Sequence, residues 1–412
     1  MSALWEEVTL KEITLKIASG STPTGGKGSY KEEGITLIRS MNVYNFEFLY
    51  KDLAYIDDKQ AKKLSNVIIE KNDILLNITG ASVGRCTIVP NHLLPARINQ
   101  HIMIIRANPN IVNSNYLLYL LNSIYYKSKL LLLSETGTTR EALTKDDISN
   151  FKLNLPPLKT QNKIAKILSN YDDLIENNNK QIKLLEEYAR VTYEEWFVRL
   201  KFPDYENVDV VDGVPEGWEI SSINKITSFV NGFAFQSNDF QDSGNSIIKI
   251  KNIGNRSIDI FNTDKVLNDI TNKLDLKYKV NTGELLIAMT GATVGKLGFM
   301  PKDKKKYYIN QRVGKIESKY IYYVFLFLNS KKGQQHINNI AMGAAQPNIS
   351  GEDILSIKSL IPKEKILNIF NKTMKNIYLD ILNLQQQNQN LKETRDILLP
   401  QLISGKLDVD TL

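Results

Sequence analysis

The sequence of 412 residues is poor in the side chains that most often bind metals or act as nucleophiles. It contains one cysteine, Cys86, and three histidines, His92, His101 and His336, which lie far apart. A single cysteine excludes an internal disulfide and fits a reducing compartment, so we expect a cytoplasmic protein. Such scattered histidines and one cysteine form no cluster with the spacing of a zinc site.

Enzyme motifs and membrane signals are also missing. The sequence has no G-x-G-x-x-G, no H-E-x-x-H, and neither N-P-P-Y nor D-P-P-Y, with which amino-methyltransferases hold the target amine. The start, "MSALWEEVTLKEI", lacks the apolar region of a signal peptide. The most apolar stretches, "NYLLYLLNSIYYKSKLLLL" and "YIYYVFLFLNS", are too short or too interrupted to span a bilayer, and we expect buried helices there.

The charge balance is basic without being extreme. Lysine and arginine total 52 against 45 acidic residues, which gives a net charge of +7. This permits nucleic-acid binding but does not establish it. A nuclease-like carboxylate set drawn from Asp303 and Glu317 has no counterpart elsewhere in the chain, and a solvated charge run explains it better.

One seven-residue stretch occurs twice, nearly unchanged. "TGASVGR" occupies residues 79–85 and "TGATVGK" occupies residues 290–296, which is 211 positions later (290 − 79). Asn99 and Asn310, in the "INQ" that follows each copy, keep the same offset. A period this long is far outside the range of solenoid repeats, which is about 20–50 residues.

Further matches extend the repeat over most of the chain. "GTTREALTKDDI" (137–148) aligns with "GAAQPNISGEDI" (343–354) at an offset of 206, and Trp5 aligns with Trp218 at an offset of 213. The offset drifts as loop insertions would make it drift. The sequence therefore predicts an internal duplication with pseudo-two-fold symmetry.

Each copy ends in a long amphipathic helix. Residues 160–200 contain neither Gly nor Pro, and a seam with alternating spacings of four and three recurs 206 residues later. Such a heptad seam favours two helices that pair antiparallel within the chain, although a helix packed on its own domain would also be amphipathic. The seam predicts these helix-pairing residues: Ile164, Leu168, Tyr171, Ile175, Ile182, Leu185, Phe370, Met374, Ile377, Ile381, Leu384, Leu391 and Leu398.

Each seam also contains one asparagine, Asn178 or Asn388. A polar residue in such a seam either fixes the register at some cost in stability or marks a solvated end of the contact. The sequence leaves these two interpretations open.

The predicted fold is α+β, with two mixed α/β domains separated by two long antiparallel helices that form an intramolecular coiled coil. Residues 202–217, "FPDYENVDVVDGVPEG", are expected to form a polar linker because they contain Pro and Gly. The predicted parts are a first globular domain (1–158), a first helix (159–201), the linker (202–217), a second globular domain (218–362), and a second helix with a C-terminal tail (363–412).

The repeated motif predicts a strand, a glycine turn and a second strand, because Gly80 and Gly84 can adopt positive φ. It is not a P-loop, since the spacing differs from G-x-x-x-x-G-K-[ST] and strand-like residues follow. A structural turn leaves unexplained why a cation, Arg85 or Lys296, follows it in both copies. Backbone amides beside a cation suit a nucleic-acid phosphate.

The residues within the loops differ between the two copies, although the flanking segments align. Either recognition of different ligands or drift in unconstrained loops would produce this difference. We assign phosphate binding to residues that recur and base reading to polar residues that differ, namely Thr22, Lys27, Thr138 and Arg140 in the first domain and Gln236, Asn238, Gln346 and Asn348 in the second. The other candidate DNA-binding residues are Arg39, Thr79, Ser82, Arg85, Asn99, Gln100, Lys249, Lys251, Thr290, Thr293, Lys296, Asn310 and Gln311. We predict no catalytic residue and no metal ligand.

With these parts in place, the chain resembles the specificity subunit of type I restriction–modification systems. The resemblance rests on "LPPLKTQNKIAKIL", "EEWFVRLKFPDY", "VPEGWE", the two repeated motifs with "INQ", and "LLPQLISGKLDV". It covers essentially the whole chain. One departure is "LIPKEK", where the first copy has "LPPLKT" at the start of its helix.

The resemblance implies that each globular domain is a target recognition domain for one half of a split DNA sequence. It also implies that the helices set the spacing between the halves and dock two methylation subunits, which use S-adenosylmethionine to methylate adenine. Restriction subunits would add ATP-driven translocation and cleavage, with magnesium. This chain would be a non-catalytic subunit without a cofactor of its own. The alternatives are a single-chain restriction or methylation enzyme and a coiled-coil scaffold that binds only proteins.

Overall fold

The computed structural model describes residues 5–135, 142–254, 256–341 and 347–409. Three predicted base-reading residues, Thr138, Arg140 and Gln346, lie outside the described residues. The chain divides into two compact units. Unit 1 comprises Met1–Ile175 with Leu391–Leu412, and unit 2 comprises Glu176–Asn390, so each long helix contributes to both units.

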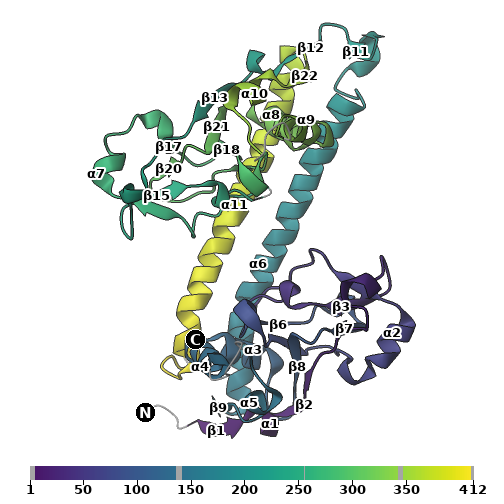
Figure 1. The fold of residues 1–412 in the computed structure, drawn as a ribbon, viewed down its shortest axis with the longest axis vertical. Helices are drawn as coiled ribbons and strands as arrows, with labels where there is room; N and C mark the ends of the chain where they lie inside the picture. The colour runs from purple at the N-terminus through teal and green to yellow at the C-terminus, as the bar shows by residue number, and fades with distance from the viewer. Residues whose placement is uncertain (1–4, 136–141, 255, 342–346, 410–412) are drawn as a thin grey trace. The chain divides into compact units, whose positions relative to one another are not determined.

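Unit 1 combines short strands with helices, as Figure 1 shows in purple and blue. Its strands are β1 (Glu6–Thr9), β2 (Thr14–Ser19), β3 (Ile35–Ile38), β4 (Ala54–Ile56), β5 (Ile74–Asn77), β6 (Cys86–Ile88), β7 (Ala96–Ile98), β8 (Ile102–Ala107) and β9 (Lys152–Leu155). Its helices are α1 (Leu10–Ile13), α2 (Asp58–Lys63), α3 (Ser114–Asn122), α4 (Ile124–Glu135), α5 (Lys145–Ser149) and the first part of α6 (Leu158–Tyr193). The first predicted apolar stretch forms α3, which is largely buried, and α4, which exposes Ile124, Tyr125 and Leu132, so only part of it is the buried helix that we expected.

Unit 2 repeats this order of elements. Its strands are β10 (Val210–Val211), β11 (Val214–Pro215), β12 (Glu219–Ser222), β13 (Ser228–Asn231), β14 (Phe240–Gln241), β15 (Asn245–Ile248), β16 (Asp264–Val266), β17 (Lys279–Val280), β18 (Leu285–Ala288), β19 (Leu297–Phe299), β20 (Tyr307–Ile309), β21 (Val313–Glu317) and β22 (Lys358–Ile361). Its helices are the last part of α6, α7 (Asn268–Thr271), α8 (Ile321–Asn329), which is the second predicted apolar stretch, α9 (Lys331–Ala341), α10 (Gly351–Ser356) and most of α11 (Glu364–Ile403).

The sheets of the two units share one topology. Unit 1 has an antiparallel sheet ordered β2-β8-β5-β6 beside a sheet ordered β4-β3-β7, and unit 2 has β13-β21-β18-β19 beside a sheet that contains β16-β15-β20. In the second sheet of each unit, one pair is parallel, β3 with β7 and β15 with β20. The predicted internal duplication is therefore present in the fold.

The strand register repeats as well. Ile74 pairs with Ile105 in unit 1, and Leu285 pairs with Ile316 in unit 2, so both partners are shifted by the same 211 positions (285 − 74 and 316 − 105). All four side chains are buried. Because a slip of one residue would turn every side chain to the other face, burial fixes this register in both units.

In unit 1, α6 and α11 run antiparallel. Asp172 of α6 forms an ion pair with Arg395 of α11, and Leu168, earlier on α6, shares a core with Leu402, later on α11. Of the predicted seam, Ile164, Leu168 and Ile175 are buried, and Tyr171, Leu391 and Leu398 are half-buried. The helix α11 continues three residues beyond Pro400 and ends at Ile403.

In unit 2, the same two helices also run antiparallel, because Asn178 of α6 contacts Gln387 of α11, whereas Tyr193, later on α6, lies against Phe370, earlier on α11, with ring centroids 6.5 Å apart. Asn178 donates to Gln387 Oε1 at 3.4 Å, and Asn388 donates to Asn179 Oδ1 at 2.8 Å. Both seam asparagines are buried, so neither marks a solvated end, and the register interpretation is favoured. Of the remaining seam, Phe370, Met374 and Ile381 are buried, and Ile182, Leu185, Ile377 and Leu384 are half-buried.

Residues 202–217 are more ordered than we expected for a polar linker. The strands β10 and β11 form an antiparallel hairpin, and Phe202 is buried against Trp218 with ring centroids 4.6 Å apart. The apolar side chain of Phe202 explains the difference, because it anchors the segment to the core of unit 2. No helix in the described part of the chain is both long and apolar enough to cross a membrane.

Candidate nucleic-acid interface

In unit 1, four loops meet where β2, β3, β5 and β7 end. Backbone amides join them: Ser21 donates to the carbonyl of Ile98 at 3.2 Å, Asn99 to Ile38 at 3.0 Å, and Ile78 to His101 at 3.0 Å. These bonds bring together the loops that carry Thr22, Arg39, Thr79 and Gln100, which lie far apart in the sequence. We call this set of loops end 1.

Unit 2 builds the same arrangement, which we call end 2. Phe233 donates to the carbonyl of Ile309 at 2.9 Å, Asn310 to Ile248 at 3.0 Å, and Met289 to Arg312 at 3.0 Å. A bridge between Thr290 and Asn348 adds the loop before α10. The predicted residues around Gln236, Lys249, Thr290, Gln311 and Asn348 thus belong to one end of this unit.

The repeated motif forms a strand, a tight turn and a strand, as predicted. A 3₁₀ turn over Gly80–Ser82 follows β5, and one over Gly291–Thr293 follows β18. Gly80 and Gly84 have φ of 65° and 76°, and Gly291 and Gly295 have 73° and 77°. Side chains with a Cβ rarely adopt these angles, which explains why both copies have glycine at both positions.

The cation after each turn is half-buried in both units. The guanidinium of Arg85 lies over the ring of Tyr44, 4.5 Å from its centroid, and this contact orients the side chain. Lys296 has the same place after the second turn. Phosphate binding by Arg85 and Lys296 stays a prediction.

A second pair of cations is equivalent by geometry. Arg39 and Lys249 each have a backbone amide that donates to an asparagine side chain, at 3.1 Å to Asn42 and at 3.0 Å to Asn252. Each also lies over an aromatic ring. Arg39 lies 5.7 Å from the centroid of Tyr30, and Lys249 lies 3.4 Å from that of Phe240.

The electrostatics of these two cations differ. Lys249 and Lys251 both form ion pairs with Asp264. Burial raises the pKa of Asp264, but hydrogen bonds from the two lysines outweigh it and leave the pKa below its ordinary value. Arg39 instead donates to the backbone carbonyl of Asp52, and its Nε is buried without a hydrogen-bond partner among the described residues. Among the described residues, the charge of Lys249 is therefore neutralised by a carboxylate, whereas that of Arg39 is not.

Two predicted DNA contacts have side chains that are not presented to solvent. Asn99 and Asn310 are buried, and the Oδ1 of Asn99 accepts the backbone amide of His101 at 3.2 Å. The side chain of Asn99 therefore helps to hold its own turn, and DNA contact by either asparagine stays a prediction. Both asparagines recur in the sequence, and the structure adds that the side chain of Asn99 bonds to its own turn.

The other predicted DNA-binding residues differ in how far their side chains are exposed to solvent. Thr22 is half-buried, and Lys27 lies in a 3₁₀ turn over Gly26–Ser29. The hydroxyls of Ser82 and Thr293 donate to the carbonyls of Thr79 at 3.4 Å and Ile250 at 3.3 Å. The side chains presented to solvent are those of Gln100, Gln236, Asn238, Lys251, Gln311 and Asn348.

Two further residues lie at these ends and were not among the predicted ones. His101 and Arg312 follow "INQ" in each copy, 211 positions apart (312 − 101). The Nδ1 of His101 lies 2.7 Å from Thr79 Oγ1, whereas the counterpart of that hydroxyl, Thr290 Oγ1, is buried without a partner among the described residues. The recurring offset, continued by one more residue, would have found both.

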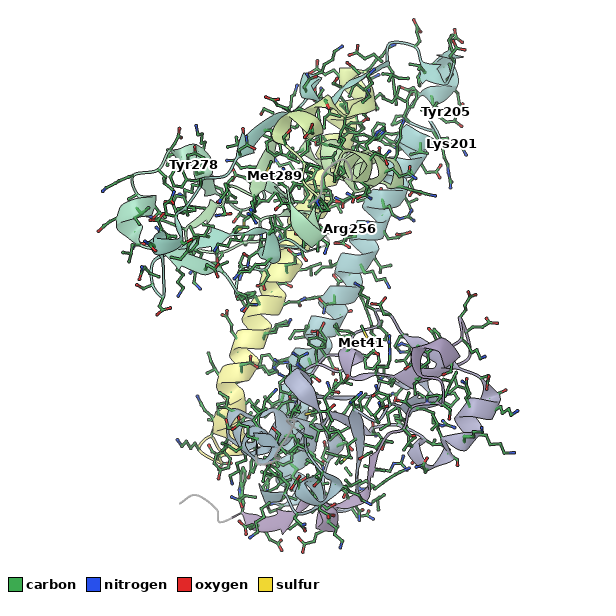
Figure 2. All side chains as sticks on the ribbon, in the orientation of Figure 1. Met41, Lys201, Tyr205, Arg256, Tyr278 and Met289 are labelled. Atoms are coloured by element: carbon green, nitrogen blue, oxygen red, sulfur yellow. The ribbon has the colours of Figure 1, made fainter. Side chains whose placement is uncertain are left out.

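Each unit also ties a hairpin tip to a long helix, through residues that sequence reasoning missed. Phe46 and Arg256 both have positive φ, 61° and 64°. The ring of Phe46 lies 4.3 Å from the guanidinium of Arg395 on α11, and Arg256, labelled in Figure 2, lies 3.7 Å from the carboxylate of Glu186 on α6. These contacts position the strands that lead into ends 1 and 2.

Other chemistry is limited in the described residues. Burial raises the pKa of the Cys86 thiol to about 12, so it is no nucleophile at neutral pH. No group of three or more metal-binding side chains occurs among them. A cavity of about 590 Å³ in unit 2 is lined by Asn245 and Lys306, at the opposite ends of β15 and β20 from Lys249 and Asn310.

Comparisons with known proteins agree with the duplication. Residues 3–187 and 215–393 match the family described as type I restriction modification DNA specificity domain. The MjaIX specificity subunit of a type I restriction enzyme from Methanocaldococcus jannaschii is 27% identical over 425 residues, with 99% of this chain and 94% of the relative covered. The HindI specificity subunit from Haemophilus influenzae is 25% identical, with 90% of this chain and 94% of the relative covered.

A solved structure supports the fold. The type I restriction–modification S subunit from M. genitalium superposes with a TM-score of 0.55 at 14% identity, with 97% of this chain and 95% of that chain covered. At this identity the similarity concerns the fold alone, and it matches the α+β architecture described above.

Proposed function

Because the chain belongs to the family of type I restriction modification DNA specificity domains, we propose that ends 1 and 2 are the surfaces with which it reads DNA. The chain recognises DNA sequence, and each unit reads one half of a bipartite target. The observation that carries this proposal is the identical loop frame of the two ends, which present different side chains. The same loop arrangement in both units suits one task, DNA recognition, performed on two different half-sites.

The proposed partners follow from the family. Two methylation subunits dock on this chain, and restriction subunits join them, with the long helices fixing the gap between the half-sites. S-adenosylmethionine, ATP and magnesium would act on those partners, and this chain would supply no reacting group. The exposed apolar side chains of α6 that lie outside the two cores, such as Leu184, support a protein contact along the helices.

The test is enrichment of bound DNA from a randomised duplex library, with the chain assembled with its methylation subunits and with the chain alone. We expect two short conserved blocks separated by a constant gap. A protein-binding scaffold would enrich no sequence. A single-chain methylation enzyme would modify DNA without any partner, and this would contradict the proposed role.

A further inference from the structure

The turn that follows β7 and the turn that follows β20 are built alike. The amide of Ile102 donates to the carbonyl of Asn99 at 3.1 Å, and the amide of Val313 donates to the carbonyl of Asn310 at 2.8 Å. Each turn is also bonded to the end of the neighbouring parallel strand through its asparagine amide, at 3.0 Å in both units. Residues 99–101 in unit 1 and residues 310–312 in unit 2 therefore occupy equivalent positions on the fold.

A glycine locks each turn against the next loop. A Cβ on Gly20 would lie 2.1 Å from the carbonyl oxygen of Asn99, and a Cβ on Gly232 would lie 2.1 Å from that of Asn310. Contact this close leaves no room for a side chain, so backbone rests on backbone in both units. The turns are thus held rigidly, as precise recognition requires.

Within this shared frame, the second residue is the same and the third is not. Gln100 and Gln311 are both exposed. His101 is half-buried, with its Nδ1 2.7 Å from Thr79 Oγ1 and its Nε2 3.3 Å from the side-chain Nε2 of Gln100. Arg312 is exposed, and no described carboxylate forms an ion pair with it.

The two side chains offer different hydrogen bonds. The imidazole of His101 is held by Thr79 through Nδ1, so only its Nε2 can bond a base edge, in exchange for the contact with the exposed side chain of Gln100. The guanidinium of Arg312 is a planar fork that matches O6 and N7 of guanine in the major groove. A residue that binds phosphate carries no sequence information and can be the same in both units. A side chain that differs between the units at a rigid, equivalent position is therefore a candidate for reading a base.

We propose that His101 and Arg312 are specificity-determining residues, each reading one base pair of its unit's half-site, with Arg312 reading guanine. This proposal rests on the proposed function. It predicts a guanine in the half-site of unit 2 and a different requirement at the equivalent position of the half-site of unit 1.

The test uses the full chain assembled with its methylation subunits, enrichment of bound DNA from a randomised duplex library, and binding of single-mismatch duplexes at several salt concentrations. The variants are Arg312→Ala, Arg312→Lys and His101→Arg. Arg312→Lys keeps the charge but loses the fork, so it retains a phosphate contact and loses bidentate reading.

We expect Arg312→Ala and Arg312→Lys to relax one position of the second block, with discrimination falling about 5- to 150-fold. The first block should not change. His101→Arg should shift one position of the first block toward guanine and leave the second block intact. Because Arg312 is exposed, its loss should not impair folding.

Three results would overturn the assignment. One is a wild-type bipartite consensus that all three variants retain. Another is uniformly weaker binding by Arg312→Ala, with a salt slope lower by about one and full recovery in Arg312→Lys, which would make Arg312 a phosphate contact. If the wild-type assembly enriches no consensus at all, the proposed function fails as well, and this outcome is distinct from the first two.

Discussion

Units 1 and 2 have the same frame but are held to the long helices by different chemistry. In unit 1, Asp172 and Arg395 form an ion pair, and the hydroxyl of Tyr119 donates to Asp172. In unit 2, the counterpart of Asp172 is Tyr378, 206 positions later (378 − 172), and its ring stacks on Tyr322 at 5.1 Å. The duplication thus preserved the backbone geometry while the side chains at the same place changed from charged to aromatic.

The cores show the same divergence. The seam of unit 1 is aliphatic at Ile164 and Leu168, whereas in unit 2 Phe370 lies 4.8 Å from Phe197 and 5.4 Å from Trp196 between ring centroids. Aromatic pairs bury more area and add edge-to-face contacts. Equal topology in the two units therefore does not imply equal sources of stability.

The largest effect is expected from the helix seam. Phe370→Ala should lower the free energy of unfolding of unit 2 by roughly 3–5 kcal/mol, because the side chain is fully buried among aromatic rings. The matched variant Ile164→Ala, 206 positions earlier, should lower that of unit 1 by about 2–4 kcal/mol. Urea unfolding followed by residue-specific hydrogen exchange would assign each loss to its unit. Equal destabilisation of both units by either variant would contradict separate cores.

The second largest effect on stability is expected from the ion pair of unit 1. Arg395→Leu should cost about 3 kcal/mol, because it leaves the carboxylate of Asp172 largely buried and without its cation. Adding Asp172→Asn should recover much of that loss, since the uncompensated charge is then removed. Tyr378→Phe in unit 2 is the control, because it keeps the stacked ring. Failure of the double variant to recover stability would exclude the electrostatic explanation.

The pH dependence of the same pair follows from its pKa. Burial raises the pKa of Asp172 although Arg395 opposes the shift. A carboxyl with a raised pKa in the folded state favours the protonated form, so its unfavourable contribution is present above that pKa and disappears as the pH falls. Without Arg395 the pKa should rise further, and Arg395→Leu should therefore regain stability on acidification relative to the wild type. Thermal unfolding between neutral pH and about pH 4, near the ordinary Asp pKa, measures this. Parallel curves for the two proteins would contradict it.

The smallest effect concerns the cations over the aromatic rings. Arg39→Ala should lower the salt slope of DNA binding by about 0.9, because one phosphate contact is lost. Lys249→Ala should lower it less, because Asp264 already neutralises that lysine. Asp264→Asn should raise the slope by releasing Lys249 and Lys251. Binding titrations of the assembled complex at several salt concentrations would show this order, and equal slopes for Arg39→Ala and Lys249→Ala would contradict it.

Much of the fold was predictable because the duplication is visible in the sequence. The offset of 211 gives the equivalent strands, and the heptad seam gives the helices. The structured segment around Phe202 was missed, because Pro, Gly and acidic residues dominate its composition. Contacts such as Phe46 with Arg395 were missed because they depend on a hairpin tip with positive φ, which leaves no periodic pattern.

The candidate site was predictable only in part. Recurrence identified Arg85, Lys296 and the glycine turns, and it also selected Asn99, whose side chain bonds to its own turn. The offset of "INQ" already makes His101 and Arg312 equivalent, but only the bonds of the turn show that the position is rigid. Arg39 and Lys249 recur in position, but their different charge environments depend on Asp264, which has no counterpart in the first copy.

The most direct test of the account is the DNA consensus of a chain in which residues 218–362 are replaced by residues 5–158, with both long helices retained. If each unit reads its own half-site through a shared frame, DNA enriched by this chain with its methylation subunits should contain the block of unit 1 twice. The block of unit 2 should be absent. Retention of the original unit 2 block, or a change in both blocks to unrelated sequences, would contradict the claim that each unit is an independent reader.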